Sequence, residues 1–241
     1  MGRLRVCTLL ALIPSVSACD PAEQTQAGEL GAGEFTYHCI EPSDAQCDEG
    51  EEVAPAAFKH IATGATLAVS YENEDRQLIA ADVYFYNRSA RLEVTEREAG
   101  SANGNAQVRF LSPGYTALLA YTVDGKVDDI LHTVVVDPAG IAISRRDEGG
   151  GSFSGSFGDV SIDVTIGLGV TLRAAPTDDA GDILAGALDC EWQSSDDSVV
   201  EIVGDPTDNV VDLDLKAPGT STITVKLGAI EASTDIVVGA P

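Results

Sequence analysis

The sequence predicts an all-β protein that folds as two tandem β-sandwiches. From Phe58 onward the chain consists of short apolar runs that alternate with polar residues, as in strands with one face in a core. Dipeptides such as Asn103-Gly104 and Asp124-Gly125 separate these runs and accept the positive φ angles of tight hairpins. No stretch keeps the 3.6-residue period of an amphipathic helix. At 241 residues, of which 44% are hydrophobic, the chain can form two domains with their own cores.

Residues 1–18 have the three parts of a secretory signal: a basic start, an apolar stretch, and small residues before a cleavage site. The apolar stretch is shorter than the roughly 20 residues that span a bilayer, which indicates a signal peptide rather than a transmembrane helix. Its end, Val16-Ser17-Ala18-Cys19, resembles the lipobox of bacterial lipoproteins. The resemblance implies cleavage between Ala18 and Cys19 and a lipid on Cys19. The alternative is an ordinary secretory cut at the same bond, after Ala18, with the cysteine at position 19 incidental.

A lipid on Cys19 would keep the exported protein on a membrane of the bacterial cell envelope, because two or three acyl chains anchor a protein stably. We expect the outer membrane or cell surface rather than the inner membrane, although Asp20 resembles a retention signal for the inner membrane in enterobacterial lipoproteins. The net charge of −25 argues against nucleic acid as a partner, since affinity for phosphate backbones depends on Lys and Arg. Anionic membrane surfaces should repel the chain as well, so the lipid would make the membrane contact.

Residues 19–54 are polar, acidic and without apolar periodicity, which predicts a flexible tether. About 38 residues from Cys19 to the first apolar run would give an end-to-end distance of roughly 30 to 37 Å. Export favours a disulfide between Cys39 and Cys47 inside this tether. The alternative is a metal site that uses His38, Cys39 and Cys47, for which the sequence offers no fourth ligand.

The β region divides near Asp137-Pro138 into residues 55–137 and 138–241. In the second part, the stretch Leu188–Val200, with its Trp-Gln-Ser-Ser-Asp motif, and the stretch Ala217–Val225, with Gly-Thr-Ser-Thr-Ile-Thr-Val, resemble the group 2 bacterial immunoglobulin-like (BIG2) family. The resemblance implies a seven-stranded immunoglobulin-like sandwich. Leu188, Cys190 and Trp192 would share one strand face, with Trp192 at the centre of the core. Cys190, which has no partner in its own domain, is expected to be a buried free thiol.

The first part, residues 55–137, resembles a divergent copy of the same immunoglobulin-like domain. Pro113–Leu118 align with Pro218–Ile223, although the Trp-x-Ser-Ser-Asp motif is missing. The aromatic cluster Tyr84-Phe85-Tyr86 falls near the place that corresponds to Trp192. Tyr84 and Tyr86 would point away from Phe85 and could form a ligand patch; the alternative is that a neighbouring strand or domain buries them.

The sequence contains none of the common catalytic motifs. The Gly-x-Ser-x-Gly elbow, His-Glu-x-x-His, a phosphate loop and Gly-x-Gly-x-x-Gly are absent, and His38, His60 and His132 lie far apart. We therefore expect no enzyme and no cofactor. Asp178, Asp179 and Asp182 form an acidic loop that could bind calcium, although solvated turn residues explain the same cluster and the spacing is not that of an EF-hand.

Two functions are compatible with these features. The first is a lipid-anchored module that presents immunoglobulin-like domains for adhesion or for binding a protein or polysaccharide. The second is a structural or spacer component of the envelope without a soluble ligand. Exposed aromatic side chains grouped on one face would favour the first, and uniformly polar faces the second.

Overall fold

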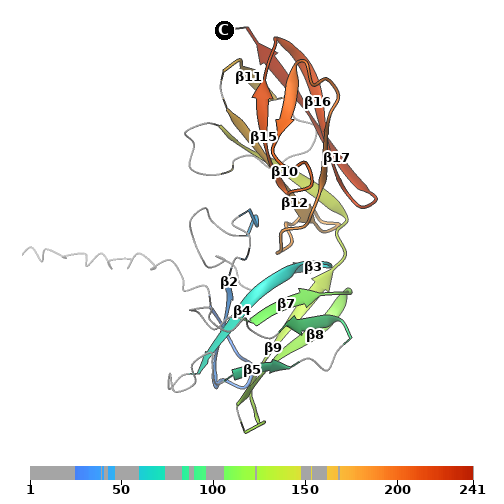
Figure 1. Ribbon diagram of the computed structural model, residues 1–241. Coiled ribbons are helices and arrows are strands. Elements are labelled where there is room, and N and C mark those ends of the chain that lie inside the picture. Colours follow the sequence, from blue (N-terminus) through green and yellow to red (C-terminus); the bar gives the residue numbers. More distant parts are fainter. Residues whose placement is uncertain are drawn as a thin grey trace, which may run out of the picture.

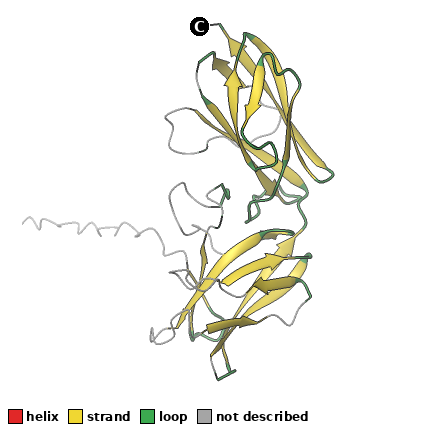
Figure 2. Cartoon of the chain, in the orientation of Figure 1, coloured by secondary structure: helices red, strands yellow, loops and turns green. Residues whose placement is uncertain are grey.

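The computed structural model describes residues 25–38, 40, 43–46, 60–73, 83–86, 90–95, 106–122, 124–147, 153, 162–167 and 169–240. Every regular element in these ranges is a β-strand (Figure 2). The described part of the chain therefore contains no helix that could cross a membrane.

The first sandwich packs a five-stranded sheet against a four-stranded sheet (Figure 1). In spatial order, the five-stranded sheet consists of β1 (Thr25–Ala27), β2 (Gly33–His38), β4 (Thr66–Asn73), β7 (Ala106–Phe110) and β6 (Leu92–Thr95). The four-stranded sheet consists of β3 (Ile61–Ala62), β9 (Val127–Val136), β8 (Gly114–Thr122) and β5 (Val83–Tyr86). Within these two sheets β3 and β9 are parallel, and the other pairs are antiparallel.

The second sandwich packs two four-stranded sheets. One consists of β10 (Gly140–Asp147), β12 (Val170–Thr177), β15 (Val210–Leu215) and β14 (Val200–Val203). The other consists of β11 (Ile162–Thr165), β17 (Ile230–Gly239), β16 (Gly219–Leu227) and β13 (Glu191–Ser194), with β11 parallel to β17. Within the stretch 160–166, which alternates most clearly in the sequence, Ile162–Thr165 form the short edge strand β11.

Both sandwiches have the same topology. In the second, the order β10-β12-β15-β14 facing β17-β16-β13 is that of immunoglobulin strands ABED facing GFC, with β11 added beside the last strand. Strands β2 to β9 repeat this order, and β1 is an additional edge strand. The predicted fold class, all-β with two tandem immunoglobulin-like sandwiches, is therefore confirmed.

Each sandwich has its own core, and Trp192 is buried in the second, where its Nε1 donates a hydrogen bond to the Asp208 carbonyl oxygen at 2.8 Å. Cys190 is a buried free thiol in the same core, as predicted. Leu188 does not share this core, because it packs against the core of the first sandwich. The predicted common face of Leu188, Cys190 and Trp192 is wrong at Leu188, since the chain crosses between the sandwiches just before β13.

The prediction of a flexible tether is wrong for Thr25–His38, which forms β1 and β2 of the first sandwich. Phe35 and Tyr37 on β2 are 0% and 1% exposed, respectively, and belong to the core. One polar residue, Thr36, separates these two aromatic residues, so β2 has a short alternating pattern inside an otherwise polar segment. Such a short alternation among Glu, Gly and Ala residues does not by itself predict a strand.

A buried carboxylate fixes the turn between β1 and β2 to the opposite sheet. Asp129 on β9 is 0% exposed and accepts hydrogen bonds from the backbone amides of Leu30, Ala32 and Gly33 at 2.8 to 3.0 Å. A Cβ atom at Gly28 would lie 2.1 Å from the Asp129 carboxyl carbon, so any other residue here would displace this carboxylate from its hydrogen bonds. The N-terminal hairpin is thus an integral part of the first sandwich.

Candidate functional site

The connection between β12 and β13 leaves the second sandwich and packs into the first. Leu184 and Ala185 of this connection are 1% and 0% exposed and belong to the core of the first sandwich. Ala185 forms a parallel bridge with Ile61, its amide donates to the His60 carbonyl at 2.9 Å, and its carbonyl accepts from the Ala62 amide at 3.0 Å. The two sandwiches are therefore joined by a buried junction as well as by the short link between β9 and β10.

Gly186 makes the close approach in this junction possible. Its φ angle is 109°, and an added Cβ would lie 2.2 Å from the Cβ of Ala65. Any side chain at this position would strain the backbone and collide with the first sandwich.

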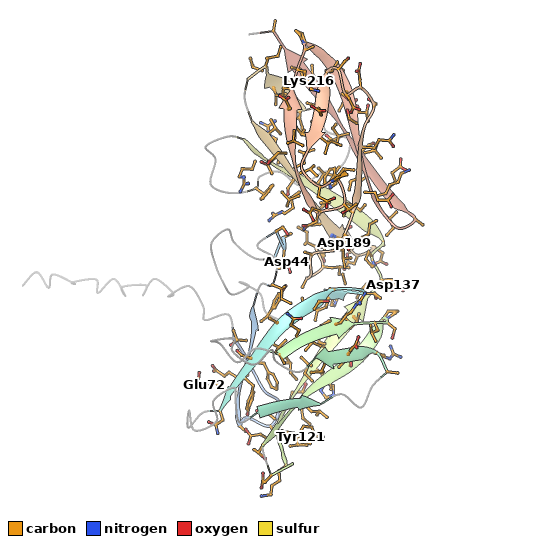
Figure 3. All side chains as sticks on the ribbon, viewed as in Figure 1. Asp44, Glu72, Tyr121, Asp137, Asp189 and Lys216 are labelled. Carbon is orange, nitrogen blue, oxygen red and sulfur yellow. The ribbon has the colours of Figure 1, made fainter. Side chains whose placement is uncertain are left out.

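Asp44 is the central polar group of the junction and is 2% exposed (Figure 3). Its carboxylate accepts hydrogen bonds from the Tyr37 hydroxyl, from the Gln46 amide at 2.9 Å and from the Gly186 amide at 3.0 Å. Burial raises the pKa of Asp44 above its ordinary value, and it outweighs the lowering effect of these hydrogen bonds. Burial and the neighbouring Asp44 carboxyl also raise the pKa of Tyr37 far above its ordinary value.

Two further contacts connect the loop around Asp44 to the second sandwich. The Asn209 side-chain amide donates to the Ser43 carbonyl at 3.1 Å, and the Gln46 side-chain amide donates to the Ile183 carbonyl at 3.0 Å. We call residues 43–46 the clasp loop. It lies in sequence between Cys39 and Cys47, which are outside the described residues, so the predicted disulfide stays a prediction, as does the alternative metal site.

Two small clefts flank the clasp loop, with volumes of about 330 and 270 Å³. Ala187, Leu188 and Asp189 line both, and Arg109 lines the smaller. Asp44 also borders the smaller cleft, but its carboxylate is occupied by the hydrogen bonds of the junction. The arrangement is suited to joining the two sandwiches rather than to acid–base chemistry.

The structure assigns a local role to one of the three calcium candidates. The Asp178 carboxylate accepts from the amides of Ala180 and Asp182 at 3.0 and 2.9 Å, and it lies 3.7 Å from Nδ1 of His60 in the first sandwich. These hydrogen bonds, led by that of Asp182, lower the pKa of Asp178. Asp179 and Asp182 are exposed. Over the described ranges, no three acidic, histidine or cysteine side chains gather where they could hold a metal ion.

The outer face of β8 and β9 carries an unusual number of apolar side chains. We call it the tyrosine face. Tyr115 is 81% exposed and Val127 is 41% exposed. Between them lie half-buried residues that share the face by strand alternation: Ala117, Leu119, Tyr121, Ile130 and Val134. His132 lies on the same face, opposite Ala117, and its Nδ1 is 2.6 Å from the Glu29 carboxylate. Figure 3 shows Tyr121 at the end of the first sandwich that is farther from the second.

The second sandwich has a polar surface at the corresponding place. Strands β8 and β16 both begin at a glycine and pair with β9 and β17 in equivalent register, so the two faces can be compared position by position. Where the first sandwich has Tyr115, Ala117, Leu119, Tyr121 and Ile130, the second has Thr220, Thr222, Thr224, Lys226 and Ser233. His132 corresponds to Asp235, and Val134 corresponds to another apolar residue, Val237, so the second face is polar except at Val237. The shared fold therefore does not require the apolar side chains of the tyrosine face.

The predicted ligand residues Tyr84 and Tyr86 lie on β5, next to β8. The register pairs Tyr84 with Tyr121 and Tyr86 with Leu119, two members of the tyrosine face. Their side chains are outside the described part of the structure. The predicted cleavage and lipidation residues, Ala18 and Cys19, also lie outside it.

Sequence reasoning did not identify Asp44, Gly186 or Asp129 as important. Asp44 and Asp129 read as ordinary acidic residues in a strongly acidic chain, and Gly186 as one of 24 glycines. The only local signal was the position of Asp44 between two cysteines.

No protein-family model matches the chain, and a search of curated proteins found no significant match. Similar solved structures include domains 5–6 of the S-layer protein SbsC, at 20% identity and a TM-score of 0.31, over 76% of this chain and 93% of that one. The D0–D1 domain of intimin is 12% identical at a TM-score of 0.27, over 74% of this chain and 93% of that one. InvD of Yersinia pseudotuberculosis is 15% identical at a TM-score of 0.30, over 77% of this chain and 56% of that one. TM-scores this low do not establish a shared function. Membership of the group 2 bacterial family also stays an expectation.

Proposed function

We propose that the chain is an exported, lipid-anchored and non-catalytic protein of the bacterial cell envelope, whose joined sandwiches present a surface that binds a protein or polysaccharide. The observation that carries this proposal is the buried junction. A partner-binding surface is most effective when it is held in a fixed orientation, because less conformational freedom is then lost on binding. The hydrogen bonds of Asp44 and Ala185 hold the second sandwich in this way.

The anchor is supported by the resemblance of Val16–Cys19 to a lipobox. We expect Cys19→Ala to release the protein from the membrane fraction, because acyl chains supply its membrane affinity. The measurement is fractionation of cells that express either form, with mass spectrometry of the N-terminal peptide. Ser17→Thr, which leaves the cysteine in place, is the control. Persistence of the Cys19→Ala chain in the membrane fraction would contradict the lipid anchor.

Presentation outside the cell is tested by protease shaving of intact cells, followed by a blot for the second sandwich. Loss of the signal would support recognition at the surface. Protection until the outer layer is permeabilised would place the sandwiches in the periplasm.

A second candidate function, a spacer of the envelope, is favoured by the polar face of the second sandwich. Co-sedimentation of the soluble Cys19→Ala chain with purified peptidoglycan distinguishes the two functions for one class of partner, the polysaccharides of the envelope. Saturable co-sedimentation with the peptidoglycan would support binding. If neither peptidoglycan nor cross-linking in intact cells finds a saturable partner, the spacer function is the better description.

A further inference from the structure

We propose that the first sandwich seats its tyrosine face on the lipid surface that holds the anchor. This inference rests on the proposed lipidation of Cys19. Its first support is the length of chain between Cys19 and β1. The tether predicted from the sequence was about 38 residues long, whereas β1 begins at Thr25. Six residue steps extend at most roughly 20 Å, at about 3.3–3.6 Å per residue. The first sandwich must therefore stay beside the bilayer.

The second support is the place where the chain enters the sandwich. The hairpin that follows Thr25 is bonded to β9, because the Glu29 amide donates to the Ile130 carbonyl at 2.9 Å. Asp129 holds the same hairpin through three backbone amides. Ile130 belongs to the tyrosine face, so the anchored end of the chain enters within a few residues of that face. The short connection to Cys19 can reach the membrane on this side.

The third support is the chemistry of the face. Tyrosine has an apolar ring and a polar hydroxyl, a combination enriched where a membrane meets water. Leu119, Ile130 and Val134 supply apolar area between Tyr115 and Tyr121. The one titratable cation that β8 and β9 place on this face is His132, which is paired with the Glu29 carboxylate at 2.6 Å. The other described outward residues of these two strands include no Lys or Arg, and the whole chain carries a net charge of −25. We therefore infer a neutral, zwitterionic lipid surface as the partner rather than an anionic one.

The contact can be weak and still be populated. A lipid on Cys19 would confine the face within the short reach of the chain, so that its binding to the bilayer becomes effectively intramolecular. Without the anchor, the same face should bind vesicles poorly.

The test uses the full lipidated chain on phosphatidylcholine vesicles that contain a nitroxide-labelled lipid. A single environment-sensitive fluorophore is attached at Tyr115→Cys, and in a matched control at Thr220→Cys, the equivalent position of the second sandwich. Cys190 is 5% exposed, and the unsubstituted chain gives the background labelling. We expect a blue shift and nitroxide quenching at position 115 and neither at position 220. Ala117→Cys with Thr222→Cys is the second pair, should the first variant fail to fold.

Each outcome has a separate meaning. If the labelled chain does not float with the vesicles, the lipid anchor itself is wrong. If it floats but the probe at position 115 stays in water, the anchor stands and the seating of the face is overturned. Equal quenching at both positions also overturns it. If the probe at position 115 is already shielded in the unlipidated Cys19→Ala chain, another part of the chain or a second copy covers the face, and ultracentrifugation distinguishes these two.

Discussion

Removal of the Asp44 carboxylate should weaken the protein at the junction. Asp44→Ala takes away the carboxylate that accepts hydrogen bonds from the Tyr37 hydroxyl and the buried Gly186 amide. Each unsatisfied buried donor costs about 1–3 kcal/mol. Relief from burying a carboxyl group offsets part of this cost. We expect the free energy of unfolding to fall by about 2–4 kcal/mol, which is a large share of the stability of a typical domain.

Urea denaturation of the soluble Cys19→Ala chain measures this change. Circular dichroism follows both sandwiches, and the fluorescence of Trp192, the single tryptophan, follows the second. Asp189→Ala is the matched control, since Asp189 lies beside the same junction but is exposed (Figure 3). Its removal should cost no more than about 0.5 kcal/mol. Equal effects of the two substitutions would refute the assignment of Asp44 as a structural carboxylate.

The pH dependence gives an independent check of the same residue. In the unfolded chain the Asp44 carboxyl has its ordinary pKa of 3.8, and in the folded chain burial raises it. Between these two values the folded state binds more protons, so the contribution of Asp44 to stability declines as the pH rises through this range. Asp44→Asn cannot ionise and lacks this decline. Its cost should therefore be greater at about pH 3, below the ordinary pKa, than at about pH 7. A cost that is smaller at about pH 3 than at about pH 7 would show that the folded-state pKa is lowered instead.

Three further predictions concern other buried groups. Gly186→Ala should destabilise the protein by about 2 kcal/mol more than Gly181→Ala. Both positions have positive φ, but only at Gly186 does the added Cβ meet Ala65; equal losses by urea denaturation would contradict this. Asp129→Ala should accelerate hydrogen exchange at the Leu30, Ala32 and Gly33 amides, with Asp137→Ala as the control, and unchanged exchange would refute the role of Asp129. Burial raises the pKa of Cys190 to about 11, so a maleimide at pH 8 should label it only after unfolding; fast labelling of the native chain would argue against burial.

The strands with sustained alternation could be predicted from the sequence. The alternating run Leu92–Thr95 is a strand, and the hairpin at Asp124-Gly125 has the positive φ at Gly125 that its sequence indicates. These features depend on neighbours in the sequence, which is why a local pattern identifies them.

The junction could not be predicted in the same way. Asp44 and Gly186 are 142 residues apart in the chain, and neither belongs to a periodic pattern. Their contact depends on how two finished sandwiches meet, which no local propensity encodes. The strand β3 could not be predicted from the sequence either, because its two residues form a strand through their pairing with Val135 and Val136.

The tandem repeat itself indicates where function should be sought. Both copies keep the same strand order and an apolar core, because those features are needed for folding. The tyrosine face and the strand β1 have no counterpart among the described residues of the second copy, which folds with threonine and lysine on the equivalent face. The fold does not demand the features that distinguish one copy from the other, so stability alone does not explain them. Both belong to the copy that is nearer to Cys19 in the chain, as expected if that copy has the membrane as its partner.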